Sequence, residues 1–585
     1  MILKKQLQNV MLSPVLLWIV GLIAFLWVLF RTGTNPKRLT YPCQQAAFPI
    51  ASAWVISFIP LIIVSQNFLF KNRIMLLSIL GIILISGIVY KYKSYLLPPK
   101  EAVVLPVWEN ENAVSDIYIY ENIPMSKGSL AAGDASVPDQ YLYDPAIDSL
   151  VYMMSYGKTP FFKTHTIPNG IVGNDDVVIL KCNFQWRHRL GTNTDRIKGV
   201  IWQILNHPDG FEGEVLVCDN QESQNGPSSW LSGFNDYSNN SDDENQSIVD
   251  VINTFKAKGY PVDFYAWDSL NIKIVAEYNQ GDLTDGYIFN SETLTSYPKF
   301  KTPKGSYVSM SSGVWNSTSK TYNKDKLTII NFPVLKAHGI AGATIALKNY
   351  IGLMNTTKSE EWFGGIDNFH SNYCFSDYAL VARELSIAWP DLNILDATYV
   401  ATESNWNYKL ETVHQQTVLA SIDPVAISWY AAKYILTPLA ENPLRTNPDL
   451  ENGGSGDYST ILNYWCNYLK KNTEFPFAKT TATTSVYSLK NLFTNTAVVD
   501  EHLSEKVKIY PMPFNQELTI SSKKFEHNKL RVRVLDISGK VVYSENVDSY
   551  GDKIMINLSH LSSGSYILKI ELQNNLFVSE KIVKH

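Results

Sequence analysis

Residues 331–349 constrain the fold most, because a buried strand there leads directly into a polar, glycine-containing turn. The apolar run 327–332 predicts a strand that is covered on both faces. Lys336 and His338 follow it and lead into a turn with two glycines. The pattern over 343–353 then predicts a helix, so the stretch is typical of a strand-to-helix junction.

The side chains at this junction indicate a ligand site. The expected helix carries Lys348 and Asn349, close in sequence to Lys336 and His338. Cations, an imidazole and free backbone N–H groups at a helix N-terminus favour an anionic or carbonyl ligand. We therefore predict His338, Lys336 and Lys348 as catalytic candidates and Asn349 as a substrate-binding residue.

The same stretch resembles a known family. The pattern P-V-L-K-A-H at 333–338, G-A-T at 342–344 and L-K-N-Y-I-G at 347–352 is similar to that of the DUF362 proteins. A second segment, A-S-I-D-P-V-A at 420–426, also resembles them. The resemblance implies an α/β fold with a site, but it implies no reaction, because the family is named for its unknown function.

Alternating apolar runs and helical patterns over 101–490 predict an α/β core with a mixed or mostly parallel sheet. Strand 177–180 is followed by Lys181 and Asn183, and strand 214–218 is followed by Asp219. Open α/β sheets bind ligands at the carboxyl ends of their strands. We therefore expect Lys181, Asn183 and Asp219 to line the same site.

Three further residues complete the predicted substrate-binding set. Thr194 precedes the predicted helix 196–205 as its N-cap. Asp396 ends a predicted strand. Asp423 precedes Pro424, where a helix is expected to begin. A capping role for Asp423 is the simpler interpretation, and a ligand contact is the alternative.

Composition excludes several classes of protein. A chain of 585 residues is long enough for several domains. A net charge of -5 without a basic stripe argues against nucleic acid as a partner. The five cysteines form no C-x-x-C pair, which excludes the usual iron–sulfur and zinc spacings. His370 and Cys374 would share one face of a helix, an arrangement that could hold a metal. The other interpretation of this stretch is a substrate-covering loop, and we therefore expect no metal. The cofactor is unknown.

The N-terminal region, 1–95, contains three long apolar segments. The segments 10–30, 48–70 and 74–90 predict a three-helix transmembrane segment in a lipid bilayer. Lys4 and Lys5 before the first segment leave a signal peptide as an alternative. The distribution of Lys and Arg around these segments favours a topology in which the core domain lies on the cytoplasmic side. This topology conflicts with the export signal described next.

The last 80 residues or so change to strictly alternating strands and predict a C-terminal antiparallel β-sandwich at 505–585. The segments K-I-Y-P-M-P-F-N at 508–515, L-D-I-S-G-K at 535–540 and L-S-S-G-S-Y at 561–566 resemble the type A sorting domain of the type IX secretion system of Bacteroidetes. The resemblance implies export, with the secretion machinery as a partner and the core on the periplasmic or extracellular side.

Two hypotheses of function follow. In the first, the protein is a cell-envelope enzyme that acts on a small anionic or carbonyl-containing substrate, with the lysines as binding groups and His338 as the acid/base. In the second, the same residues bind a small molecule without turnover.

Overall fold

The computed structural model divides the chain into two compact units, Met1–Pro99 and Lys100–His585. The residues that the structure describes are 25–26, 101–126, 128–156, 158–186, 188–220, 240–270, 273–403, 412–488, 507–522, 525, 528–536, 541–549, 551–572 and 575–584.

The prediction of a transmembrane segment is corrected by the structure. The segments 10–30, 48–70 and 74–90 lie outside the described residues, except for Phe25 and Leu26, which are helical. Among the described residues, no helix has the length and apolar character that crossing a membrane requires. A span needs about 20 apolar residues. The predicted fold class is therefore corrected in its three-helix transmembrane part, and the predicted lipid-bilayer partner and membrane location find no support among the described residues.

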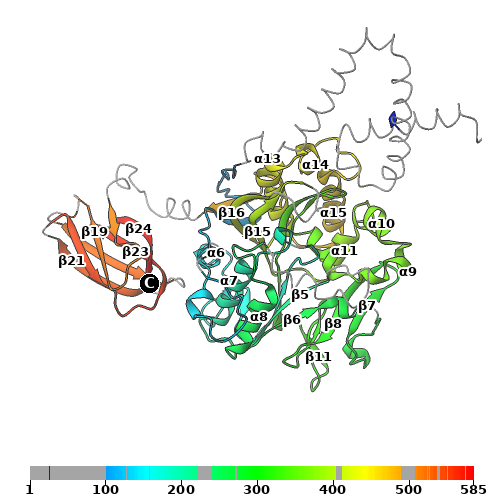
Figure 1. The fold of residues 1–585 in the computed structure, drawn as a ribbon, viewed down its shortest axis with the longest axis horizontal. Helices are drawn as coiled ribbons and strands as arrows, with labels where there is room; N and C mark the ends of the chain where they lie inside the picture. Colours follow the sequence, from blue (N-terminus) through cyan, green and yellow to red (C-terminus); the bar gives the residue numbers. More distant parts are fainter. Residues whose placement is uncertain are drawn as a thin grey trace, which may run out of the picture. The chain divides into compact units, whose positions relative to one another are not determined.

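A 10-stranded mixed sheet forms the centre of the second unit (Figure 1). Its strands follow the order β17 (Thr484–Ser488), β1 (Ser115–Tyr120), β16 (Thr412–Ser421), β15 (Leu392–Ala401), β12 (Leu327–Asn331), β4 (Val177–Lys181), β5 (Glu214–Asp219) and β6 (Val262–Ala266), while β13 (Val334–His338) pairs with β15 and β14 (Gly342–Thr344) pairs with β13. From β15 to β6 neighbouring strands are parallel, whereas β16 is antiparallel to both β15 and β1.

Helices cover both faces of this sheet because alternate strand residues point to opposite sides. In β4, Val177 and Ile179 belong to one apolar cluster, while Val178 and Leu180 belong to the other. The first cluster includes residues of α11 (Leu380–Ile387), α12 (Pro424–Ala431) and α15 (Tyr458–Asn472). The second includes residues of α6 (Pro145–Tyr156), α7 (Thr194–Leu205) and α8 (Ile248–Ala257). The core is thus a three-layer α/β/α arrangement.

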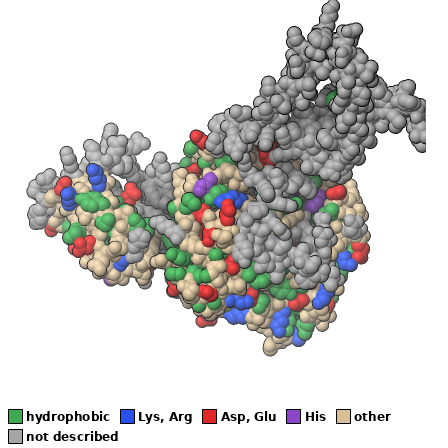
Figure 2. All heavy atoms as spheres, in the orientation of Figure 1, with side chains coloured by type: hydrophobic (Ala, Val, Ile, Leu, Met, Phe, Trp, Pro, Cys, Tyr) green, Lys and Arg blue, Asp and Glu red, His purple; other side chains and the backbone are tan. Residues whose placement is uncertain are grey.

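A separate antiparallel sheet of five strands lies between residues 286 and 323. Its order is β11 (Thr321–Asn323), β10 (Gly313–Asn316), β9 (Tyr307–Ser309), β8 (Thr295–Lys301) and β7 (Gly286–Asn290). Strands this short give too few alternations to be recognised from sequence. Figure 2 shows Lys and Arg side chains over the end of the core where Figure 1 labels β7, β8 and β11.

Shorter elements connect these layers. They are β2 (Phe162–Lys163), β3 (Val172–Gly173), η2 (Asp139–Tyr141), η3 (His188–Leu190), η5 (Trp267–Leu270), η6 (Tyr278–Gln280), η7 (Lys324–Lys326), η8 (Lys348–Leu353), η9 (Thr356–Lys358), α9 (Ser359–Phe363), α10 (Ile366–Asn368), η10 (Phe369–Cys374), η11 (Ala432–Leu436), α13 (Thr437–Leu439) and α14 (Pro443–Thr446).

The C-terminal residues form two facing antiparallel sheets. One contains β18 (Lys508–Tyr510), β19 (Glu517–Ser521) and β22 (Lys553–Asn557), and the other contains β21 (Val541–Ser549), β20 (Asn528–Leu535), β23 (Gly564–Leu572) and β24 (Asn575–Lys584). Residues of both sheets, such as Ile520 and Val532, share one apolar cluster, as expected of a β-sandwich. The division of the chain at 1–95, 101–490 and 505–585 stays a prediction.

Candidate functional site

The carboxyl ends of β4 and β12 and the first residues of β15 place polar side chains side by side. In the sheet register, Lys181 at the end of β4 is level with Asn331 at the end of β12, and Asn331 is level with Asn393 in β15. All three residues are buried. Buried polar groups are stable only when they are hydrogen-bonded, so their partners define the local structure.

These partners form a continuous chain of side-chain amides. Lys336 Nζ donates to Asn183 Oδ1 at 3.1 Å, and Asn183 Nδ2 donates to Asn349 Oδ1 at 3.1 Å. Asn349 Nδ2 donates to Asn331 Oδ1 at 2.8 Å, and Asn331 Nδ2 donates to Asn393 Oδ1 at 2.8 Å. Each amide donates with one end and accepts with the other, so the position of Lys336 is coupled to the sheet interior.

A buried ion pair joins the same network. Lys181 Nζ lies 2.7 Å from Asp219 Oδ1, and both side chains have 2% of their surface exposed. Lys181 Nζ also donates to Asn349 Oδ1 at 3.3 Å and to the Cys182 carbonyl at 2.8 Å. The second oxygen of Asp219 accepts from the Phe184 N–H at 2.7 Å. The pair is therefore hydrogen-bonded at both ends, which buried charges require.

Lys336 and His338 lie on the first strand of a β-hairpin, and the second strand takes the place of the start of the helix that the sequence predicted over 343–353. In the hairpin of β13 and β14, Lys336 is directly opposite Thr344, and His338 is opposite Gly342. Residues 348–353 form the 3₁₀ helix η8. The helix prediction is therefore wrong. Gly342 has φ +70°, and a side chain there would lie 2.4 Å from the Arg445 carbonyl, so tertiary packing determines this turn.

The His338 ring is half-buried and fixed by backbone groups. Its Nδ1 accepts from the N–H groups of Ile340 at 3.2 Å and Ala341 at 3.0 Å. Burial, followed by the charges of Lys348, His370, Lys336 and Arg445, holds the pKa of His338 well below its usual range. With Nδ1 accepting, the proton of the neutral ring is on Nε2, which is then a donor.

An aromatic ring connects Lys348 and His370 to this region. Lys348 Nζ lies 5.6 Å from the centroid of the Phe375 ring. His370, in the π-helical turn η10, stacks on Phe375 with centroids 5.6 Å apart, and His338 lies 6.1 Å from the same ring. The Cys374 side chain is buried, and its carbonyl accepts from Trp465 Nε1 at 2.8 Å.

Asp396 and Thr194 belong to a second buried network. Asp396 Oδ2 accepts from the Asn193 N–H at 3.0 Å and from Asn240 Nδ2 at 2.7 Å. Asn193, rather than Thr194, is the N-cap of α7, because its Oδ1 accepts from the N–H groups of Asp195 and Arg196. The Thr194 hydroxyl instead accepts from Gln246 Nε2 at 2.8 Å. The N-cap prediction is therefore wrong by one residue.

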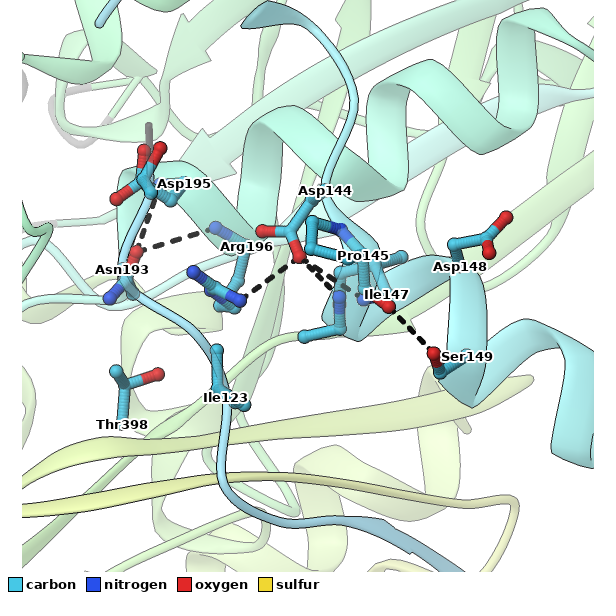
Figure 3. A network of polar contacts seen from close by, with 12 residues as sticks. Ile123, Asp144, Pro145, Ile147, Asp148, Ser149, Asn193, Asp195, Arg196 and Thr398 are labelled. Atoms are coloured by element: carbon cyan, nitrogen blue, oxygen red, sulfur yellow. Dashed lines mark hydrogen bonds and ion pairs between the residues drawn. The ribbon is translucent and has the colours of Figure 1, made fainter. Parts of the chain in front are cut away.

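Figure 3 shows the part of this second network around Arg196, with Asp144, Asn193 and Asp195. Arg196 Nη1 is 3.0 Å from Asp144 Oδ1, and both side chains are buried. Asp195 Oδ1 pairs with Lys198 Nζ at 3.1 Å. Asp144 also caps the start of α6 through the N–H groups of Ala146 and Ile147. These contacts join α6 to α7, so we interpret this network as structural.

Asp423 lies apart from both networks and has the capping role. Its Oδ1 accepts from the N–H groups of Val425 and Ala426, at the start of α12. Its Oδ2 accepts from the Ser115 hydroxyl at 2.5 Å and from the Ala478 N–H at 2.7 Å. The carboxylate thus ties a helix, a strand and a distant loop together.

The structure therefore divides the predicted site residues. It joins Lys181, Asn183, Asp219, Lys336 and Asn349 in one network, with His338 and Lys348 next to it. It places Thr194 and Asp396 in the second network and Asp423 at a helix cap. Sequence reasoning missed Asn331, Asn393 and Thr344. Two of them had a signal in the sequence: Asn331 is an amide near the end of a predicted strand, and Thr344 belongs to the G-A-T segment of the family resemblance.

The family comparison agrees with the two resemblances. Residues 319–433 match the model of a domain of unknown function, DUF362. Residues 508–585 match the model of a secretion system C-terminal sorting domain. The chain therefore carries a DUF362 segment followed by a type IX sorting domain, and both resemblances are confirmed. The sorting domain links the chain to the type IX secretion machinery and indicates a secreted or cell-envelope protein. No curated protein matches the sequence of the chain.

Some solved structures resemble a small part of the chain. One is a DUF3244-family protein from Bacteroides vulgatus with an immunoglobulin-like β-sandwich fold: 17% identity, 15% of this chain, 89% of that chain and a TM-score of 0.13. Latent PorU from Porphyromonas gingivalis has 18% identity over 14% of this chain and 9% of its own, with a TM-score of 0.12. CopC from Methylosinus trichosporium has 16% identity over 14% of this chain and 84% of its own, with a TM-score of 0.11. TM-scores of this size establish no shared fold for the chain.

Replacing Gly352 with alanine should separate the Lys181–Asp219 pair. The added Cβ would lie 2.4 Å from both Asp219 Oδ1 and Lys181 Nζ. Because the pair is buried, we expect Gly352→Ala to lower the free energy of unfolding by about 3 kcal/mol, measured by urea denaturation. Gly454→Ala is the matched control, since its Cβ would meet Asp457 only at 3.5 Å. Equal stability of the two variants would contradict the crowding argument.

Asp396 and Asp423 should make stability fall as pH rises from about 4 to about 6. Burial raises the pKa of each carboxyl to about 6, from 3.8 in an unperturbed chain. Between these values the native protein binds more protons than the unfolded chain, so each group lowers the free energy of unfolding by about 3 kcal/mol as pH rises.

Urea denaturation at several pH values tests this dependence. We expect Asp423→Asn to reduce the slope, because asparagine also caps helices but carries no titrating proton. Asp325→Asn, at an exposed position, is the control and should leave the slope unchanged. A slope that Asp423→Asn does not alter would show that the Asp423 carboxyl is not its source.

Proposed function

We propose that this secreted or cell-envelope protein binds a small molecule with an anionic or carbonyl oxygen beside Lys336, His338 and Lys348. The observation that carries the proposal is the sign of the charges around His338. Lys348, His370, Lys336 and Arg445 all act to lower its pKa, and Lys348 Nζ and the His338 ring lie 5.6 Å and 6.1 Å from the same Phe375 ring. Cationic side chains gathered in this way favour an anion or a polarised carbonyl oxygen.

His338 would serve this ligand as a neutral hydrogen-bond donor. Its Nδ1 accepts hydrogen bonds from two backbone N–H groups. Protonation of Nδ1 would turn it into a donor that faces these two donors, which is unfavourable. Its Nε2–H would be directed to a ligand oxygen. This role replaces the acid/base role that we expected from the sequence, and backbone bonding of His338 is also the feature that favours binding without turnover.

Catalysis is the second candidate function, because a neutral imidazole donor can polarise a carbonyl group. In that case His338 would stabilise developing charge on the carbonyl oxygen, and a neighbouring lysine would hold the anionic part of the substrate. The hydrogen bonds of Lys336 to Asn183 and to the Leu190 carbonyl support a fixed position for the ammonium group.

Isothermal titration of the full chain with inorganic phosphate, acetate and glycolate tests the binding site. We expect millimolar or tighter binding of at least one anion. Lys336→Met and Lys348→Met should each weaken it about tenfold, because each removes a charge-assisted hydrogen bond. Lys326→Met is the control, since Lys326 pairs with Asp175 at the partly exposed, opposite end of β12. Equal binding by all variants would refute the site.

Proton NMR of the bound compounds over several hours distinguishes catalysis from binding alone. Conversion of a compound by the wild-type chain, lost in His338→Ala while binding persists, would identify an enzyme. Unchanged spectra for every anion that binds would favour the binding protein.

A further inference from the structure

Thr344 is a polar residue on the face of the hairpin that also carries Lys336 and His338. It lies directly opposite Lys336 in the antiparallel pair, and opposite residues of such a pair project to the same side. The other face of the hairpin carries Leu335, Ala337 and Ala343, which belong to the hydrophobic core. The hydroxyl of Thr344 therefore belongs to the polar side, together with the two candidate ligand-binding residues.

The Thr344 hydroxyl is buried without a hydrogen-bond partner. The residue is 1% exposed, and within the described ranges of the chain its Oγ1 has no partner. An unsatisfied buried hydroxyl costs about 1–3 kcal/mol, and valine would fill almost the same space without that cost. A hydrogen bond from the Thr344 hydroxyl to a bound molecule would explain why threonine, and not valine, occupies this buried position.

Two other buried threonines of the α/β core have hydrogen-bonded hydroxyls. Thr328, in β12, is also buried, and its hydroxyl donates to Asp176 Oδ2 at 2.7 Å. The Thr192 hydroxyl donates to the Phe332 carbonyl at 2.8 Å. Both of these hydroxyls stabilise the fold. Thr344 differs from them because its hydroxyl has no partner within the described ranges, although it lies on the same face of the hairpin as Lys336 and His338.

We infer that Thr344 is a specificity-determining residue of the site, whose hydroxyl binds a second oxygen function of the same ligand that Lys336 holds by its anionic group. This inference rests on the proposed function. It assigns the ligand to the small carboxylates or related anions that also carry a hydroxyl or carbonyl oxygen a few bonds from the charge. A hydroxyl both donates and accepts, so Thr344 can bind either kind of oxygen.

Two matched pairs of acids test the inference by isothermal titration of the full chain. Glycolate differs from acetate, and γ-hydroxybutanoate from butanoate, only by one hydroxyl. We expect the wild-type chain to bind at least one hydroxylated acid about tenfold more tightly than its counterpart. Thr344→Val should abolish this preference while leaving the affinity for acetate and butanoate unchanged.

Thermal unfolding without ligand provides an independent readout. The Thr344 hydroxyl has no hydrogen-bond partner among the described residues, so replacing it removes no hydrogen bond. Thr344→Val should therefore keep or raise the Tm. Thr328→Val, the matched control, should lower the Tm because it removes a hydrogen bond to a buried carboxylate, and it should retain the preference for hydroxylated acids.

The outcomes separate the two proposals. If acids bind in a Lys336-dependent way but Thr344→Val keeps the preference, or no preference exists, the inference about Thr344 is wrong and the proposed function stands. A Tm lowered by Thr344→Val as much as by Thr328→Val would show a structural hydroxyl and also refute it. If the wild-type chain binds neither the four acids nor inorganic phosphate, the proposed function fails, and the inference fails with it.

Discussion

The buried Lys181–Asp219 ion pair is the interaction on which the candidate site depends. It joins the carboxyl ends of β4 and β5, and removing one partner of such a pair leaves an uncompensated buried charge. Its remaining hydrogen bonds reach Asn349 and the Phe184 backbone, so three separate segments are positioned by one pair of charges. The close approach of Gly352 to both charged atoms excludes any side chain there. Thus a glycine and an ion pair far apart in sequence form one structural unit.

Much of the parallel part of the fold was predictable, because its strands are continuous apolar runs with polar residues at their ends. The strand predicted at 177–180 is β4 (Val177–Lys181), and the one at 214–218 is β5 (Glu214–Asp219). The helix predicted at 196–205 is α7 (Thr194–Leu205), although Asn193 caps it. The region after Lys336 was not predictable in this way. Local sequence favours a helix there, whereas contacts of Gly342 with the segment around Arg445 require a hairpin turn.

The candidate site was predictable as a set of residue types, but not as a network. Strand-end reasoning brings Lys181, Asp219 and Asn183 together, because neighbouring parallel strands end at the same edge. The same reasoning does not show that Asn331 and Asn393 continue the amide chain, because their roles depend on the register between β12 and β15. Nor does sequence show that Thr344 is opposite Lys336, since the hairpin itself was not expected. The pairing of residues on neighbouring strands cannot be read from a single sequence, so residues whose role depends on that pairing are not found in advance.

The structure also gives the lysines of the site different roles. The charge of Lys181 is compensated by Asp219 within the fold, which makes Lys181 a structural cation. Burial, together with the charges of Lys348 and Lys336, lowers the pKa of His338. Under the proposed function, an arriving anion would be attracted by these two lysines and would receive a hydrogen bond from a histidine that does not need to be protonated. The amide chain connects Lys336 to the interior of the sheet through hydrogen bonds between neutral side chains, and these bonds fix the position of its ammonium group.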